Sequence, residues 1–121
     1  MSVPARRPEL PAFKAEFFKA LAHPVRIRIL EILRTGERSV NELQDALGLD
    51  QAAVSQQLAV LRARQVVSTS RAGSTVRYAI RDPAVGDLLD VARRIFNNHL
   101  TGTRTMLREL QREAAAPRRR R

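Results

Sequence analysis

Residues 39–61, SVNELQDALGLDQAAVSQQLAVL, decide the fold of this chain. Ser39 followed three residues later by Glu42 is a capping box, which predicts the start of a short helix. Gly48 ends that helix, and Asp50 is placed to cap a second one. Apolar residues at helical spacing within the two segments are Val40, Leu43, Ala46, Leu47, Val54, Leu58 and Leu61. Two helices joined by a short turn that contains glycine are typical of a helix-turn-helix motif.

Two further helices precede this motif. Phe13, Phe17 and Leu21 recur every four residues and predict an amphipathic helix that begins near Pro11. Pro24 suits the first turn of the next helix, because its missing N–H has no helical partner there. Residues 1–10 are expected to form a flexible basic arm.

After the helix-turn-helix motif, apolar residues alternate with a period of two instead of following helical spacing. Val76, Tyr78 and Ile80 alternate with other residues, and with Val67 and Thr69 they predict a β-hairpin around a polar turn. A last long helix is expected from residue 83 onward, and Gly102 leaves open whether it is interrupted. We therefore expect a mostly helical α+β domain over residues 11–116, with about five helices and a two-stranded hairpin, followed by a basic tail at 117–121.

The composition favours a polyanionic partner and excludes several functions. The 121 residues carry a formal net charge of +10, and only 4% are aromatic, too few for the stacking platforms that bind single-stranded nucleic acid. Duplex DNA is therefore the expected polyanion. The chain has no cysteine, which excludes disulfides and thiolate metal sites. No apolar run reaches the length of a membrane span, so we expect no membrane partner and a soluble, cytoplasmic protein.

The charge is concentrated where DNA binding requires it. Residues 51–81, which include the second motif helix and the hairpin, contain five arginines and no acidic residue. On the second motif helix, Val54, Leu58 and Leu61 point inward. This leaves Ala52, Gln56 and Ala63 outward and Ser55 at the flank. The residues predicted to contact DNA are Gln51, Ala52, Ser55, Gln56, Arg62, Arg64, Arg71, Ser74 and Arg77.

Several of these motifs together resemble the ArsR/SmtB family of bacterial winged helix-turn-helix repressors. The resemblance covers roughly residues 13–100 and rests on residues 22–30, AHPVRIRIL, on Val54-Ser55-Gln56-Gln57-Leu58, and on Gly73 and Tyr78. The resemblance implies a homodimer with the first and last helices at the interface. It also implies that the second motif helix, which is the fourth helix of the chain, lies in the major groove and that the hairpin is a wing on the DNA backbone. All four phenylalanines lie in the two terminal helices, which agrees. The predicted interface residues are Phe13, Phe17, Leu88, Ala92, Ile95 and Phe96.

Members of this family commonly sense metals, so we compared the residues present with the family's sites. The thiolate site needs cysteine, which the stretch 39–43 lacks. The family's interfacial site on the last helix uses four ligands. This chain matches only one of them, with Asp82. One alternative remains: His99 with Asp87, Asp90 or a residue of the partner chain would suit Ni²⁺ or Zn²⁺. The other interpretation of His99 is a hydrogen-bonded residue at the dimer seam, and His23 is expected to cap the second helix.

The leading hypothesis is a dimeric, sequence-specific transcription regulator that binds a two-fold operator. Alternatives are a nickel- or zinc-responsive version, a regulator controlled by a partner protein and, from another class, a nonspecific nucleoid-type protein. An enzyme is not expected, because the chain has no cysteine nucleophile, no glycine-rich phosphate loop and no histidine with a partner at motif spacing.

Overall fold

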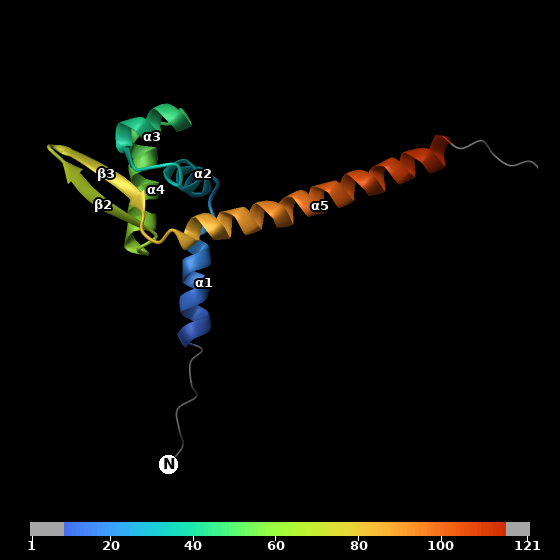
Figure 1. Ribbon diagram of the computed structural model, residues 1–121, viewed down its shortest axis with the longest axis horizontal. Coiled ribbons are helices and arrows are strands. Elements are labelled where there is room, and N and C mark those ends of the chain that lie inside the picture. Colours follow the sequence, from blue (N-terminus) through green and yellow to red (C-terminus); the bar gives the residue numbers. More distant parts are fainter. Residues whose placement is uncertain (1–8, 116–121) are drawn as a thin grey trace, which may run out of the picture. The chain divides into compact units, whose positions relative to one another are not determined.

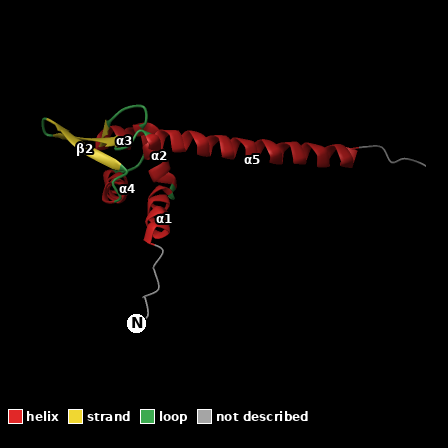
Figure 2. Ribbon diagram, turned by 60° about the horizontal axis from the view of Figure 1, so that its bottom comes forward, coloured by secondary structure: helices red, strands yellow, loops and turns green. Residues whose placement is uncertain are grey.

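The computed structural model describes residues 9–115 and shows a mostly helical α+β fold with a small sheet (Figures 1 and 2). The helices are α1 (Glu9–Leu21), α2 (Pro24–Leu33), α3 (Val40–Leu47), α4 (Gln51–Ala63) and α5 (Ala84–Ala115). The strands are β1 (Arg38–Ser39), β2 (Val67–Ala72) and β3 (Thr75–Ile80). The predicted helices and the hairpin are confirmed, and the fold is that of a winged helix-turn-helix.

Local side-chain chemistry sets the limits of the two motif helices. The Ser39 hydroxyl accepts a hydrogen bond from the Glu42 N–H at 3.2 Å, and the Glu42 carboxylate accepts one from the Ser39 N–H at 3.0 Å, which completes the predicted capping box. Gly48 ends α3 in the left-handed conformation, with φ of 67°. Asp50 then caps α4 by accepting a hydrogen bond from the Ala53 N–H at 2.8 Å. These contacts fix the angle at which α4 leaves the turn.

The hairpin belongs to a three-stranded antiparallel sheet with the order β1-β3-β2. Thr69 pairs with Tyr78 within the hairpin, and Gly73 at its tip has φ of 66°. The additional strand β1 was not predicted, because two residues are too short to show an alternating pattern. It pairs with β3 through Arg38 opposite Tyr78 and Ser39 opposite Arg77, so the strand that precedes α3 is also part of the wing sheet.

The described chain forms two compact units, the first ending at Gly86 and the second beginning at Asp87. The core lies in the first unit, where α2, α3, α4 and the sheet enclose it. Its buried hydrophobic residues are Ala20, Ile29, Leu30, Leu33, Leu43, Val54, Leu58, Leu61, Val66, Val67 and Val85. Within the described residues, the first unit thus contains the core and the second unit is helical.

The expected boundary at Pro11 lies close to the start of helix α1. Helix α1 begins at Glu9, two residues before the expected boundary at Pro11. Proline is compatible with the first turn of a helix, and the acidic Glu9 side chain suits the positive end of the helix dipole. The other residues of the predicted arm, 1–8, and the predicted tail at 117–121 lie outside the described residues.

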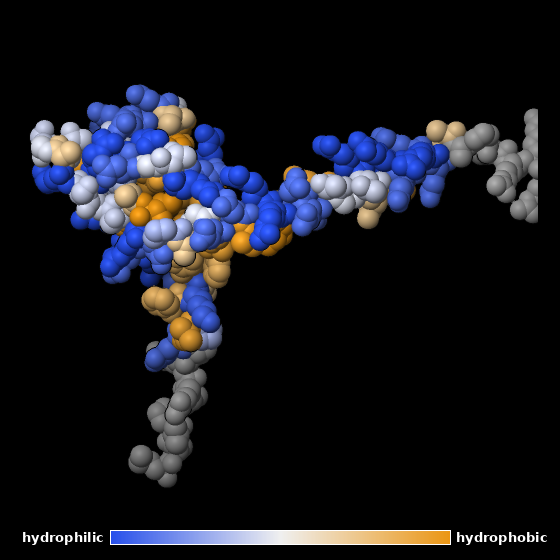
Figure 3. Space-filling model, viewed as in Figure 1, coloured by the Kyte–Doolittle hydropathy of each residue, from blue (hydrophilic) through white to orange (hydrophobic). Residues whose placement is uncertain are grey.

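The second unit is the continuation of α5, which runs without interruption through Gly102 to Ala115. Its large apolar side chains are exposed, as are several in α1 (Figure 3). Those on α5 are Val91, Ile95, Phe96, Leu100, Met106, Leu107 and Leu110, and those on α1 are Leu10, Phe13 and Phe18. None of the helices between residues 9 and 115 is long and apolar enough to cross a membrane.

Candidate nucleic-acid interface

Helix α4 exposes the face that was predicted to contact DNA. Val54, Leu58 and Leu61 are at most 1% exposed and anchor the opposite face in the core. Their burial fixes the rotation of α4 about its axis, so Ala52 and Gln56 are exposed and Ser55 is half-buried at the flank. Gln51 is exposed in the first turn, where the free backbone N–H groups of a helix can bind phosphate.

An open groove of about 440 Å³ runs between α4 and the wing. Ser55, Ala59, Arg62 and Ala63 line it from α4, and Tyr78 lines it from β3. The fold therefore brings the predicted DNA contacts Ser55 and Arg62 together on one surface. Ala59 and Tyr78 were not predicted as site residues; Ala59 lies one helical turn after Ser55, so helical spacing could have identified it.

The wing tip carries an exposed arginine, in addition to the exposed Arg62 on α4. Arg71 near the end of β2 and Ser74 in the turn are both exposed. Among residues 9–115, Arg71 makes no hydrogen bond or ion pair with another side chain, and the same is true of Arg62. Both guanidinium groups are thus available to an anion outside the chain.

The predicted contact Arg64 is already paired inside the protein. Its Nη2 atom lies 2.8 Å from a carboxylate oxygen of Glu16 on α1, and both side chains are about half-exposed. The same carboxylate group lies 3.4 Å from the Nζ atom of Lys19. Exposed pairs of this kind contribute only about 0–1 kcal/mol, so the contact connects α4 to α1 but does not prevent Arg64 from binding phosphate.

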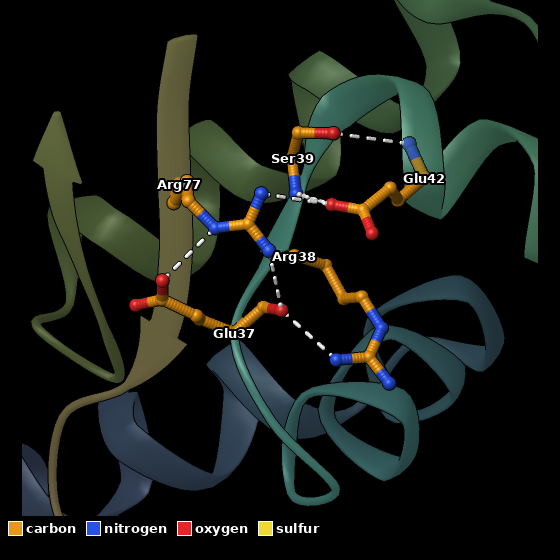
Figure 4. Close-up of polar contacts among 5 residues, drawn as sticks. All are labelled: Glu37, Arg38, Ser39, Glu42 and Arg77. Atoms are coloured by element: carbon orange, nitrogen blue, oxygen red, sulfur yellow. Dashed lines mark hydrogen bonds and ion pairs between the residues drawn. The ribbon is translucent and has the colours of Figure 1, made fainter. Parts of the chain in front are cut away.

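The predicted contact Arg77 is also paired inside the protein. Its guanidinium lies 2.9 Å (Nε) from the Glu37 carboxylate and 3.0 Å (Nη1) from the Glu42 carboxylate, and Nη2 donates a hydrogen bond to the Glu37 carbonyl oxygen at 3.1 Å (Figure 4). Only 26% of the side chain is exposed. All three guanidinium nitrogens are engaged within the chain, so Arg77 is not a free cation of the wing.

The carboxylate of Glu42 is held in its charged form. Hydrogen bonding from the Ser39 backbone N–H lowers the pKa of Glu42 below its ordinary value of 4.5, and the Ser39 hydroxyl and the charge of Arg77 lower that pKa further. Glu42 is therefore ionised at neutral pH, which is the form that pairs with Arg77.

The predicted dimer residues differ in exposure. Phe13, Ile95 and Phe96 are exposed, whereas Leu88 and Ala92 are half-buried. Phe17 is also half-buried and packs edge-on against Phe18, with ring centroids 5.6 Å apart. A continuous set of exposed apolar residues remains on α5.

The histidines and the hypothetical metal ligands are not brought together in one chain. The Nδ1 atom of His23 accepts a hydrogen bond from the Val25 N–H at 3.1 Å, which confirms that His23 caps α2. Asp87 and Asp90 lie 12 and 9 residues before His99 on the unbroken helix α5. At a rise of 1.5 Å per residue these separations are about 18 and 14 Å, too long for shared ligation of one ion. No group of three or more metal-binding side chains occurs within residues 9–115.

Comparisons with known proteins agree with this geometry. The sequence model described as "Bacterial regulatory protein, arsR family" matches residues 23–69. The uncharacterized HTH-type transcriptional regulator Rv0081 of Mycobacterium tuberculosis is 46% identical over 99 residues, covering 81% of this chain and 87% of that protein. The regulator NmtR of the same species is 45% identical over 78 residues, covering 64% of this chain and 65% of its own.

Solved structures of other regulators have a similar fold. The crystal structure of Rv0081 has a TM-score of 0.74 at 46% identity and covers 81% of this chain and 98% of that one. The solution structure of the homodimeric winged helix-turn-helix DNA-binding domain of Mb0332 from Mycobacterium bovis has a TM-score of 0.71 at 28% identity, covering 81% and 94%.

The fold, the exposed α4 face and the wing together define a winged helix-turn-helix protein. The chain belongs to the ArsR/SmtB family of bacterial transcriptional regulators. The family resemblance noted in the sequence is confirmed, and so is the prediction that this protein is not an enzyme.

Proposed function

We propose that the protein acts in the cytoplasm as a homodimer that binds a two-fold symmetric operator in double-stranded DNA. Helix α4 enters the major groove, and the wing tip lies on the adjacent phosphates. The observation that carries this proposal is the exposed surface of α4 and the wing, which includes Gln56, Arg62 and Arg71 and contains no acidic residue. Helix residues read base edges, and cations next to them neutralise phosphates.

The second copy is proposed to cover the apolar faces of α1 and α5. Phe13 on α1 is 74% exposed, and Phe96 and Leu100 on α5 are 63% and 66% exposed. Large apolar side chains exposed along a helix face mark an interaction surface, and a two-fold interface would bury the same residues from both chains. Mb0332, which is similar in structure, is described as homodimeric.

Selection of bound sequences from a random DNA pool, followed by footprinting, tests the proposal. We expect enrichment of an inverted repeat whose half-site centres are about one helical turn, or ~34 Å, apart. A nonspecific nucleoid-type protein would instead enrich no sequence and protect DNA without boundaries. That result would reject the proposed function.

The signal that controls the protein is proposed to be sensed outside the DNA-binding surface, by a metal ion or by a partner protein. A Ni²⁺ or Zn²⁺ site would need His99 from one subunit together with Asp87 or Asp90 from the other, because one α5 keeps them too far apart. Titration of Zn²⁺ or Ni²⁺ into the operator complex distinguishes the two. Release or tightening of the complex at stoichiometric metal supports a metal effector, and an unchanged complex supports a partner protein.

Replacing Arg71 by alanine should reduce the salt dependence of DNA binding. Each phosphate neutralised contributes about −0.9 to the slope of log K against log salt, so losing one contact in each subunit should flatten the slope by about 1.8. Operator and random DNA should be affected alike, because phosphates carry no sequence information. Arg112→Ala, which removes the same charge from α5, serves as the control and should leave the slope unchanged. Equal slopes for Arg71→Ala and the parent would show that the hairpin does not contact the backbone.

A further inference from the structure

The side chain of Arg77 connects the wing to the start of the helix-turn-helix. It projects from the central strand β3 and contacts Glu37, which precedes β1, and Glu42, which lies in the first turn of α3 (Figure 4). The two carboxylates flank the strand β1 in sequence. One guanidinium thus contacts both ends of the segment 37–42, which contains β1 and the first turn of α3.

The backbone reinforces the same connection. Ser39 pairs with Arg77 in the sheet, and it is also the N-cap residue of α3. The Glu42 carboxylate accepts from the Ser39 N–H at 3.0 Å and pairs with Arg77 at 3.0 Å. The Glu42 carboxylate therefore takes part both in the N-cap of α3 and in the ion pair that joins the wing to α3. Movement of either contact would disturb the other.

We propose that Arg77 is a positioning residue: its contacts with Glu37 and Glu42, which we call the wing clamp, hold the β2–β3 hairpin at the angle to α3 and α4 that DNA binding requires. The proposal rests on the proposed function for its effect on DNA. It assigns to Arg77 a role that net charge alone does not, since two of the three side chains in the clamp are acidic and repel DNA.

The position of the clamp makes it effective. Gly73 at the wing tip lies four residues before Arg77 in the sequence, which at 3.3 Å per residue is at most about 13 Å. A rotation of the hairpin by about 10° at the clamp would displace the tip by about 2 Å, which is enough to break a hydrogen bond or ion pair to phosphate. Breaking the wing clamp should therefore weaken the proposed contacts between Arg71 at the wing tip and DNA phosphates.

Glu37→Ala gives a test in which charge and geometry predict opposite signs. The substitution removes a negative charge, so simple electrostatics predicts tighter DNA binding, and a freed Arg77 would tighten it further. The wing clamp predicts weaker operator binding, by about two- to fivefold, the range expected for one exposed ion pair. Asp45→Ala is the matched control. Asp45 is exposed on α3 and makes no hydrogen bond or ion pair among residues 9–115, so this variant should bind as tightly as the parent or slightly tighter.

A double-mutant cycle separates positioning from direct contact. If Arg77 acts through the wing, Arg77→Ala should weaken operator binding by about tenfold in the parent but by much less in the Arg71→Ala background. If Arg77 itself touched phosphate, the two losses would multiply. Circular dichroism of each variant confirms folding, and the Glu37→Ala comparison does not depend on Arg77→Ala being stable.

Hydrogen exchange of the β3 amides in the free protein completes the test, because it needs no DNA. Exchange should be faster in Glu37→Ala than in the parent and unchanged in Asp45→Ala. Unchanged exchange, unchanged or tighter operator binding by Glu37→Ala, or equal weakening by both variants overturns the proposal. Failure of the parent to select any operator rejects the proposed function instead, and the exchange experiment then decides on the clamp alone.

Discussion

Phe96→Asp should convert the dimer into monomers and lower operator affinity by at least about a hundredfold, since each monomer then binds only one half-site. Phe96 is 63% exposed in the chain and lies on the apolar face of α5, between Ala92 and Leu100. Burying a carboxylate at that position of an interface, without a partner, costs several kcal/mol. The monomer itself should remain folded, because Phe96 is not part of the core.

Light scattering at micromolar concentration and operator titration measure the two effects. Thr105→Asp is the matched control, because nine residues at 100° each place Thr105 on the side of α5 opposite Phe96. This variant should remain dimeric and bind the operator normally. A dimeric Phe96→Asp variant would show that the second copy does not cover this face of α5.

The parts of the fold that could be predicted are those specified by neighbouring residues. The capping box of Ser39 and Glu42, the left-handed Gly48 and the cap at Asp50 each involve groups no more than four residues apart. Helical spacing likewise placed Val54 and Leu58 inside and Gln56 outside. Such signals depend on local chemistry, and the tertiary structure preserved them.

The strand β1 and the ion pairs of Arg77 could not be predicted, because both depend on groups far apart in the sequence. Arg77 and Glu37 are 40 residues apart, and the sequence shows an arginine in an acid-free stretch without showing the carboxylates that the fold brings to it. Counting charge by segment identified the stretch 51–81, which has five arginines and no acidic residue. It could not distinguish Arg71, which is available to an external anion, from Arg77, which is neutralised within the chain.

The same distinction between local and distant partners applies to α5. Its apolar spacing predicted a long helix, and the unbroken path through Gly102 agrees. Spacing could not show that Phe96 and Leu100 would be exposed rather than buried in the core, since helical periodicity gives the direction of a face and not what covers it. The exposure of that face in a single chain is what now supports the dimer.

Gln56→Ala should weaken operator binding by about 1–3 kcal/mol for each half-site and weaken binding to random DNA far less. Gln56 is exposed in the second turn of α4. Its side-chain amide can form a bidentate pair with adenine, because Nε2 can donate to N7 and Oε1 can accept from the N6 amino group. A dimer presents one Gln56 to each half-site, so the loss should occur at two symmetric positions of the footprint.

Parallel titrations of operator and random duplexes, at one salt concentration, measure this loss of specificity. Gln57→Ala makes the same chemical change at the adjacent residue, which is half-buried and points 100° away around the helix, so it should leave the ratio of specific to random affinity nearly unchanged. If Gln56→Ala weakened both duplexes equally, Gln56 would contact the DNA backbone. The surface of α4 that reads the bases would then be rotated about the helix axis from the one proposed, toward Ala52 and Ala59.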